Sequence, residues 1–320
     1  MPPYRTKETD PFGSASLSFY YFCSMIKLQT PVIDASCKVG ISYSDRIMML
    51  GSCFSDNIGR QLADFGFDVC VNPFGTLYNP ISILQSIRRM VSGKPYTAED
   101  CEEMGAGSPL ICSFEHHTSF AAKSREEFIE NANKALESAS EYYRGCSKLI
   151  ITLGTSWCYR HTERNIIVSN CLKRPGYEFT RERLSMEQIC NALKEIIVLC
   201  SGNDTIKAKE IIFTVSPIRH FKDGAHGNQL SKSALLLGID QVIGATEGNA
   251  AADYFPAYEI VMDELRDYRF YAEDMCHPSA QTVDYIRERF LDWALPEKER
   301  PQLEENIRSY RRSCHRPMNQ

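Results

Sequence analysis

The chain has 320 residues, of which 43% are hydrophobic and 24% are charged, a balance typical of a soluble globular protein with a sizeable core. Its formal net charge of -5 at pH 7 leaves no excess of Lys and Arg to neutralise phosphates, which argues against a nucleic-acid partner. No apolar run approaches the length of a transmembrane helix, so we expect no membrane partner.

The cysteines also limit the kind of protein this can be. There are 13 of them, scattered along the chain without a Cys-x-x-Cys pair. The usual spacing of zinc ligands is therefore absent, and we expect no metal site. Free thiols in a reducing compartment fit this pattern better than the disulfide framework of a secreted protein. We therefore expect a cytoplasmic protein.

The two ends of the chain are expected to lie outside the main fold. The apolar patch at residues 19–23 is too short for a signal peptide and follows acidic residues. We predict an N-terminal extension over residues 1–25, a folded domain over residues 26–295, and a C-terminal helix and tail over residues 296–320.

From residue 46 onward, short apolar runs alternate with amphipathic helical patterns, as in parallel β-α units. Residues 46–50 predict a buried strand that ends at Gly51, and a helix follows that is capped by Gly66. Residues 67–71 predict the second strand, and Asn79-Pro80 opens a second helix.

The second half of the chain continues this alternation. Strands are predicted at residues 148–153, 210–215 and 268–271, and the last core helix begins at Pro278. The spans 92–147 and 159–182 are longer than normal connections, so we interpret them as insertions. The first carries a helix over residues 126–143, and the second carries a hairpin that joins residues 166–168 to 177–179.

A glycine or proline follows each of four predicted strands. These residues are Gly51, Gly75 (in the turn after the second strand), Gly154 and Pro217. In open parallel sheets, the ligand crevice lies outside the carboxyl ends of the strands. Chemistry is therefore expected from the residues that follow these strand ends.

The turn Gly51-Ser52-Cys53 joins a strand directly to a helix. This placement puts Cys53 at a helix N-terminus, where free N–H groups and the helix dipole lower a thiol pKa and stabilise an oxyanion. Cys53 is therefore a candidate nucleophile. The alternative interpretation is that Gly51 merely permits the turn and Cys53 packs inward.

Asp274 and His277 form the second candidate pair, in the string Asp274-Met-Cys-His277-Pro278. Proline is favoured in the first turn of a helix, so His277 is expected on the loop just before that helix. Asp274 lies close enough to orient the imidazole through one nitrogen while the other nitrogen takes a proton from a nucleophile. A surface Asp next to a helix-capping His would give the same sequence.

Several strings together resemble a known family. The turn reads Gly51-Ser-Cys-Phe-Ser55, and similar strings follow in order at residues 29–32, 72–75, 152–157, 214–220, 230–232 and 254–279. These strings resemble the GSCFA family, a branch of the SGNH/GDSL hydrolase superfamily, and the resemblance covers residues 26–295.

This resemblance implies a flavodoxin-like three-layer α/β/α fold with a mostly parallel sheet. It also implies a role for each matching position. Cys53 takes the place of the nucleophilic serine, Gly75 is an oxyanion glycine, Ser156 replaces an oxyanion asparagine, and Asp274 and His277 complete the triad.

Two departures from the superfamily pattern change the expected chemistry. A thiolate at residue 53 makes good thioesters, so acyl transfer is as plausible as hydrolysis. Ser156 has a shorter side chain than asparagine, so oxyanion stabilisation would fall by a few kcal/mol. A shift of the turn by one residue would instead make Ser52 the nucleophile.

Secondary candidates border the same crevice. His220 and Trp157 follow strand ends and are candidate substrate-binding residues, although His220 would also serve as a loop cap and Trp157 as a core residue. His116 and His117 are expected in a surface loop of the long insertion. Lys232 has no assigned role.

The sequence thus predicts an esterase-like hydrolase of acyl esters of a small molecule or carbohydrate, which needs no metal or organic cofactor. Two alternatives remain. One is an acyltransferase that uses the same site, and the other is a non-catalytic binding protein that keeps the fold.

Overall fold

The computed structural model describes residues 30–32, 36–245 and 252–314. All elements below belong to the unit Pro31–Gln320, which is the larger of two compact units of the chain. The predicted extension over residues 1–25 lies outside the described residues.

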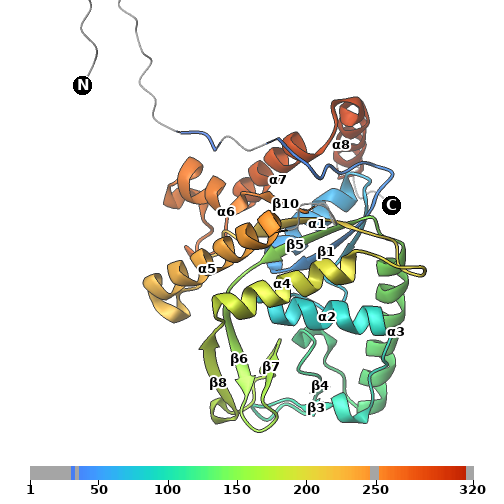
Figure 1. The fold of residues 1–320 in the computed structure, drawn as a ribbon, viewed down its shortest axis with the longest axis vertical. Coiled ribbons are helices and arrows are strands. Elements are labelled where there is room, and N and C mark those ends of the chain that lie inside the picture. Colours follow the sequence, from blue (N-terminus) through green and yellow to red (C-terminus); the bar gives the residue numbers. More distant parts are fainter. Residues whose placement is uncertain (1–29, 33–35, 246–251, 315–320) are drawn as a thin grey trace, which may run out of the picture. The chain divides into compact units, whose positions relative to one another are not determined.

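A parallel sheet forms the centre of this unit (Figure 1). Its five strands lie in the order β10-β9-β5-β1-β2, and every neighbouring pair is parallel. The strands are β1 (Arg46–Gly51), β2 (Asp68–Val71), β5 (Lys148–Leu153), β9 (Glu210–Val215) and β10 (Ala252–Phe255). Counted along the chain, this is the 2-1-3-4-5 order of flavodoxin-like sheets, whose ligand crevice opens where the order reverses, between β1 and β5.

Helices cover both faces of the sheet, which gives the three layers expected from the sequence (Figure 1). The longer helices are α1 (Cys53–Asp64), α2 (Pro80–Ser92), α3 (Arg125–Gly145), α4 (Met186–Cys200), α5 (Gly224–Ala245), α7 (Ala280–Ala294) and α8 (Arg300–Cys314). A short α6 (Ala257–Glu259) runs into the π-helical η5 (Ile260–Leu265). The element α8 occupies most of the C-terminal stretch for which a helix is predicted.

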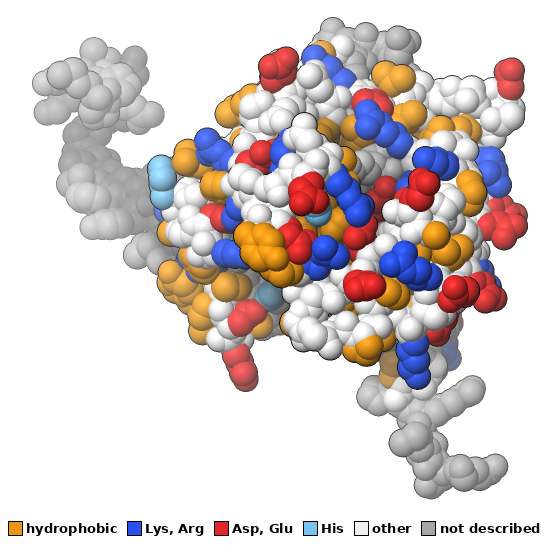
Figure 2. Space-filling view, turned by 90° about the horizontal axis from the view of Figure 1, so that it is seen from below, with side chains coloured by type: hydrophobic (Ala, Val, Ile, Leu, Met, Phe, Trp, Pro, Cys, Tyr) orange, Lys and Arg blue, Asp and Glu red, His pale blue; other side chains and the backbone are white. Residues whose placement is uncertain are grey.

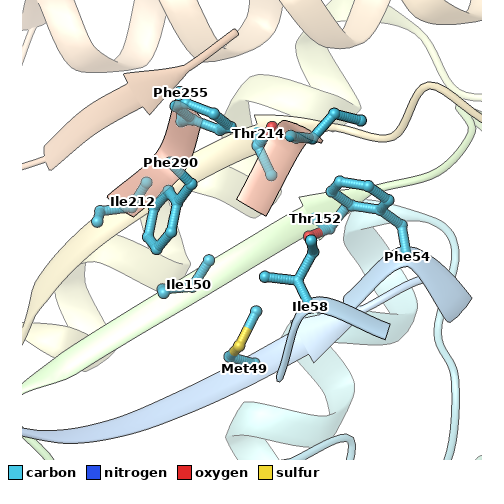
Figure 3. Close-up of a pocket in the computed structure, with 10 residues that line it drawn as sticks. Met49, Phe54, Ile58, Ile150, Thr152, Ile212, Thr214, Phe255 and Phe290 are labelled. Atoms are coloured by element: carbon cyan, nitrogen blue, oxygen red, sulfur yellow. The ribbon is translucent and has the colours of Figure 1, made fainter. Parts of the chain in front are cut away.

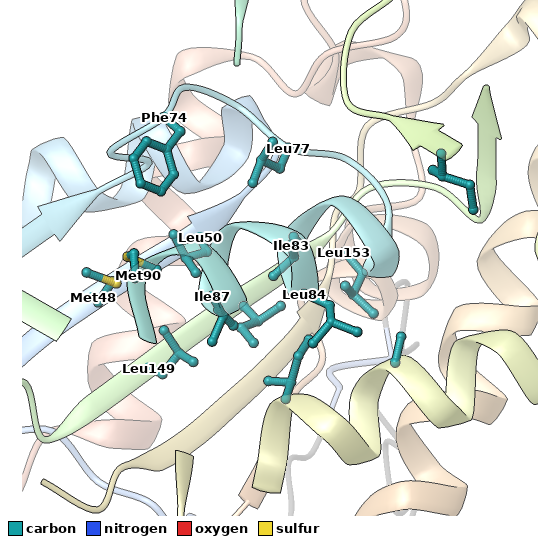
Figure 4. Packing of buried hydrophobic residues seen from close by; sticks show 14 of the residues in the cluster. Met48, Leu50, Phe74, Leu77, Ile83, Leu84, Ile87, Met90, Leu149 and Leu153 are labelled. Atoms are coloured by element: carbon teal, nitrogen blue, oxygen red, sulfur yellow. The ribbon is translucent and has the colours of Figure 1, made fainter. Parts of the chain in front are cut away.

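Alternate residues of the central strands point to opposite faces, because successive side chains of a strand do so. Met48 and Leu50 of β1 pack with α2, α3, α4 and α5, whereas Ile47 and Met49 pack with α1 and α7. Figure 4 shows Ile83, Leu84 and Ile87 of α2 against the strands. Both faces of β1, β5 and β9 are therefore buried, and this explains why these strands are continuous apolar runs in the sequence.

One predicted strand is wrong and one strand was missed. Most of the predicted strand at residues 268–271 is the single 3-10 turn η6 (Tyr268–Phe270), because the Asp267 carboxylate accepts the N–H of Arg269 at 2.9 Å and caps the turn. Tyr271 follows this turn and forms only an isolated bridge with Pro278. The fifth strand is β10, whose sequence mixes Asp253 with aromatic residues. As an edge strand, β10 has one neighbour in the sheet and a less regular apolar pattern.

The second insertion forms an antiparallel sheet with a different pairing from the predicted one. Its strands are β6 (Trp157–His161), β7 (Ile166–Val168) and β8 (Phe179–Arg183), in the order β7-β6-β8. The predicted hairpin between β7 and β8 is therefore wrong, because β6 lies between them and pairs with both. The first insertion carries the short pair β3 (Glu102–Glu103) and β4 (Ile111–Cys112) before α3.

The surface carries charges of both signs. Figure 2 shows acidic and basic side chains interspersed over one face of the molecule, and neither sign forms a broad patch on that face. Among the described residues, no helix combines the length and apolar character needed to cross a membrane.

Candidate active site at the strand ends

The nucleophile turn (Gly51, Ser52 and Cys53) is fixed against the neighbouring strand β5. Gly51 has φ +144°, and a Cβ at this position would lie 2.2 Å from the Thr152 carbonyl oxygen. Glycine is therefore required here. The Ser52 N–H donates to the same carbonyl oxygen at 3.3 Å, so the turn is held at the end of β1.

The turn gives Ser52 and Cys53 different environments. Ser52 is fully buried and is the N-cap of α1, since its Oγ accepts the N–H of Phe54 at 3.3 Å. Cys53 is the first residue of α1 and is half-buried. Among the described residues, its Sγ has no side-chain hydrogen-bond partner. The geometry therefore favours Cys53 over Ser52 as the group that can meet a substrate.

The pKa of Cys53 shifts in the opposite direction from the one that the sequence suggests. Burial raises the pKa of this thiol above its ordinary value, and the carboxylate of Asp56 raises it further. The N–H groups of Cys53 and Phe54 and the charge of Lys232 lower it, as expected at a helix N-terminus, but burial outweighs them. Cys53 in this state therefore needs a base to become a thiolate.

Lys232 of α5, to which the sequence gives no role, lies at the same strand ends. Its side chain is fully buried, and its Nζ donates to the carbonyl oxygens of Gly154 and Ser216, both at 2.6 Å. These carbonyls follow β5 and β9. Burial lowers the Lys232 pKa to about 7, although the nearby thiolate of Cys53 would raise it. A buried ammonium group therefore lies within electrostatic range of the candidate nucleophile.

His220 borders the same edge of the sheet, after β9. Its ring contacts that of Tyr78 at a centroid distance of 6.3 Å, and its backbone N–H donates to Asn228 Oδ1 at 3.0 Å. Its buried Nε2 has no hydrogen-bond partner within the described ranges. Burial and the charge of Lys232 lower the His220 pKa to about 4, so this ring is neutral at pH 7.

Asp274 and His277 form the hydrogen-bonded pair that the sequence predicts. His277 Nδ1 lies 2.5 Å from Asp274 Oδ2, and Asp274 Oδ1 accepts the N–H groups of Cys276 and His277 at 2.9 Å. These two N–H groups and the imidazole lower the Asp274 pKa to about 2, so the carboxylate stays ionised. The side chains of His277 and Asp274 are 52% and 50% exposed, so the pair faces solvent.

The histidine loop (residues 272–278) is fastened to the segment after β9. The Arg219 N–H donates to the Cys276 carbonyl oxygen at 3.1 Å, and the Ala272 N–H donates to the His277 carbonyl oxygen at 2.7 Å. His277 and Lys232 both contribute to the electrostatic environment of His220. The two halves of the candidate site therefore belong to one edge of the sheet. Within the described residues, no hydrogen bond joins Cys53 Sγ to an imidazole.

The two positions assigned to oxyanion binding already have hydrogen-bond partners. The Gly75 N–H donates to the Asn72 carbonyl oxygen at 2.8 Å, and Ser156 Oγ donates to Ser231 Oγ at 3.1 Å. Ser156 is also fully buried. Their oxyanion roles stay predictions, and they require these bonds to open when a substrate binds.

Trp157 begins β6 and is held by its surroundings. Its Nε1 donates to the Gly227 carbonyl oxygen at 3.3 Å, and the Arg181 guanidinium lies 5.5 Å from its ring centroid. Trp157 therefore joins the second insertion to the start of α5. Its predicted contact with substrate stays a prediction.

The surface location predicted for His116 is wrong. Its ring is fully buried among Phe74, Tyr96, Phe120 and Phe128, and its Nδ1 lies 2.6 Å from Ser113 Oγ. The long insertion folds back onto the Phe74-Gly75 turn and covers this side chain. Burial lowers the His116 pKa to about 3, so the ring is neutral.

An apolar cavity lies between α1, the sheet and α7 (Figure 3). Phe54 and Ile58 border it from α1, and Phe255 and Phe290 border it from the opposite side. Its free volume is about 20 Å³, room for little more than one water molecule. This cavity is therefore a packing defect of the core and not a substrate site.

Within the described residues, no group of three or more His, Cys, Asp or Glu side chains is arranged to hold a metal ion.

Comparisons with known proteins give a family for the chain. None of the curated proteins compared with the chain matches it. The model of the GSCFA family matches residues 46–290, a span that includes both the nucleophile turn and the histidine loop. The chain therefore belongs to the GSCFA family.

Proposed function

We propose that this protein is an acyl-ester hydrolase in which Cys53 is the nucleophile, His277 the general base and acid, and Asp274 the residue that orients His277. The observation that carries the proposal is the Asp274–His277 pair at 2.5 Å, on a loop fastened to the strand-end segment near Cys53. A carboxylate that holds one imidazole nitrogen leaves the other available for proton transfer.

The first half of the reaction forms a thioester. His277 Nε2 accepts the thiol proton as Cys53 Sγ attacks the carbonyl carbon of the ester. The tetrahedral oxyanion collapses, the C–O bond to the alcohol breaks, and His277 returns the proton to the departing alkoxide. We assign the N–H of Cys53, at the start of α1, as a donor to the developing oxyanion.

The second half of the reaction hydrolyses the thioester. His277 takes a proton from water, the hydroxide attacks the acyl carbon, and the C–S bond breaks. The acid is released and the proton returns to Cys53 Sγ. Because burial raises the pKa of the resting thiol, the first half needs a base to remove its proton. In the second half the same base is needed for a different reason, namely to remove a proton from water.

The substrate class follows from the superfamily, whose assignment is part of this proposal. The 2-1-3-4-5 strand order, the glycine turn at the end of the first strand and the late Asp-x-x-His pair all support an SGNH-like hydrolase. We infer that the substrate is an acyl ester of a small molecule or carbohydrate. Transfer of the acyl group from the Cys53 thioester to an alcohol, in place of water, is a variant of the same chemistry.

The test is turnover of short-chain nitrophenyl esters by the wild type and by Cys53→Ala, Ser52→Ala and His277→Ala. We expect activity in the wild type and in any folded Ser52→Ala protein, and loss of activity in the other two. Activity that survives Cys53→Ala but is lost in Ser52→Ala would move the nucleophile to Ser52. Product that forms only when an acceptor alcohol is added would identify a transferase.

A non-catalytic binding protein is the second candidate, and one observation favours it. The N–H of Gly75 and the hydroxyl of Ser156 both have other partners in this structure, so two expected oxyanion donors are occupied. The rate of iodoacetamide labelling at Cys53 as a function of pH separates the candidates. An enzyme whose base assists the thiol reacts well below the ordinary thiol pKa of about 8.5, whereas an unassisted thiol does not.

A further inference from the structure

A second hollow lies beside the histidine loop, between the segment after β9 and the segment after α6. Arg219, Arg266, Tyr268 and Tyr271 border it, together with Val261, Met262 and Asp267. Its volume is about 170 Å³, too small for a whole ligand of ordinary size and suitable for one chemical group.

Aromatic rings hold the Arg219 guanidinium at this hollow. Its Cζ lies 4.3 Å from the ring centroid of Phe221 and 5.4 Å from those of Tyr268 and Tyr271. Stacking of this kind fixes the plane of a guanidinium group and leaves its N–H edge available. Its side-chain hydrogen bond is a long one, from Nη1 to the Met275 carbonyl oxygen at 3.5 Å.

In the part of the chain that the structure describes, the two arginines of the hollow have no direct ion pair, although the carboxylate of Asp267 also borders it. Across the described ranges, neither Arg219 nor Arg266 forms an ion pair with a carboxylate. Asp267 is engaged elsewhere, since it accepts the N–H of Arg269 at 2.9 Å and lies 3.7 Å from the Arg269 side chain. Two arginines therefore border one hollow, and the carboxylate beside them is paired with a third arginine.

The backbone around Arg266 is unusual. The preceding residues form the π-helical η5, and Arg266 ends it with φ +46°, in the left-handed region. Non-glycine residues in this region are uncommon, and π-helical turns often occur at functional sites. This conformation places Arg266 at the rim of the hollow.

We infer that this hollow is an oxyanion subsite that binds a carboxylate or phosphate group attached to a planar or apolar moiety. Two guanidinium groups recognise such an oxyanion through charge-assisted hydrogen bonds. The exposed ring of Tyr268 offers a surface on which the attached moiety stacks. Arg219 also anchors the histidine loop, so the hollow adjoins the candidate active site. We therefore assign the bound carboxylate or phosphate group to the ester substrate, and this assignment rests on the proposed function.

The test measures binding without catalysis, by calorimetric titration of the Cys53→Ala protein. Phenyl phosphate and benzoate are the two anionic probes, which separate phosphate from carboxylate recognition, and benzyl alcohol is the neutral control. We expect at least one anion to bind more tightly than the alcohol. Arg219→Gln and Arg266→Gln, each introduced into this protein, should weaken that binding by about tenfold or more.

Arg144→Gln is the matched control, since Arg144 is an exposed arginine of α3 and does not border the hollow. It should bind the anions as the parent protein does. The inference is wrong if neither anion binds better than benzyl alcohol, if Arg266→Gln has no effect, or if Arg144→Gln weakens binding equally. Ester turnover by the wild type is measured separately, so failure of the subsite and failure of the proposed function give different results.

Discussion

The nucleophile turn and the histidine loop lie at the same edge of the sheet but are built differently. Ser52 is fully buried, Gly51 is in contact with the backbone of β5, and Lys232, which donates to carbonyls at the same strand ends, is fully buried. The side chains of Asp274 and His277, in contrast, are about half exposed. The first half is part of the core, whereas the second is a surface loop held by backbone hydrogen bonds.

This difference separates stability from reactivity. Substitutions in the nucleophile turn should change the free energy of unfolding, because they disturb close packing. Substitutions in the histidine loop should change reaction rates with little effect on unfolding, because the replaced side chains face solvent. The following predictions test this division.

The largest effect is expected for His277→Ala and Asp274→Asn. Loss of the base, or of the group that orients it, should reduce ester turnover by about 10²- to 10⁴-fold. The melting temperature of His277→Ala should stay at the wild-type value, because the imidazole is exposed. Asp274→Asn keeps an Oδ1 for the N–H groups of Cys276 and His277 but loses the charge, so its melting temperature should fall slightly. Turnover and thermal unfolding of the same preparations give the two readouts.

His226→Ala is the control for these variants, since His226 is an exposed histidine at the start of α5. Its turnover should match the wild type. A drop in melting temperature for His277→Ala as large as its loss of activity would contradict the proposed division.

Gly51→Ala should have the largest effect on stability. The added Cβ would lie 2.2 Å from the Thr152 carbonyl oxygen at a φ that alanine rarely adopts, so we expect a loss of roughly 3 kcal/mol in the free energy of unfolding. Gly93→Ala is the matched control. Gly93 also has a positive φ, but nothing lies within 4 Å of the added Cβ, so its cost is about 1 kcal/mol. Urea denaturation of both variants measures the difference, and equal losses would show that the contact with β5 is unimportant.

Some elements of the fold are predictable from the local sequence pattern, and others are not. The strands β5 and β9 occur at the predicted residues, because strands buried on both faces are unbroken apolar runs. The strand β10 was missed because an edge strand lacks that run. The three aromatic residues within 268–271 resemble a strand in the sequence, although Asp267 caps a turn there.

The candidate site shows the same limit. The pairing of Asp274 with His277 is predictable because the two residues are three positions apart on one loop. The position of Lys232 is not predictable in this way, since it depends on how α5 crosses the ends of two strands. The pKa of Cys53 also required the structure, because the sequence indicates the helix N-terminus but not the burial that outweighs it.

Lys232 provides a test of the electrostatics of the buried half. Replacement by Met removes a charge that lowers the Cys53 pKa, although burial and Asp56 have larger effects. The thiol pKa should therefore rise, and iodoacetamide labelling at a fixed neutral pH should slow by about two- to threefold. Lys209→Met is the matched control. Lys209 is also buried, but it precedes β9 and therefore lies at the opposite edge of the sheet. If both variants shift the pH profile of labelling equally, Lys232 has only a structural role.

The last prediction concerns His116, which is buried in the core, unlike the exposed His277. Its pKa falls from 6.5 to about 3 in the folded protein. The unfolded chain therefore binds a proton as the pH falls below 6.5, whereas the folded chain does not until about pH 3. Stability from this residue is full above pH 6.5 and is lost across that window, by about 1.4 kcal/mol per pH unit at most.

His116→Phe keeps an aromatic ring in the cluster of Phe74, Tyr96, Phe120 and Phe128 and removes the titrating group. Urea denaturation between pH 6.5 and 4 should show a smaller loss of stability for this variant than for the wild type. His220, whose pKa is about 4, adds to the remaining slope, so the slope should decrease without vanishing. If the dependence of stability on pH does not change, His116 is accessible to solvent in the folded protein. The insertion that covers the Phe74-Gly75 turn would then be open to water, as the histidine loop is.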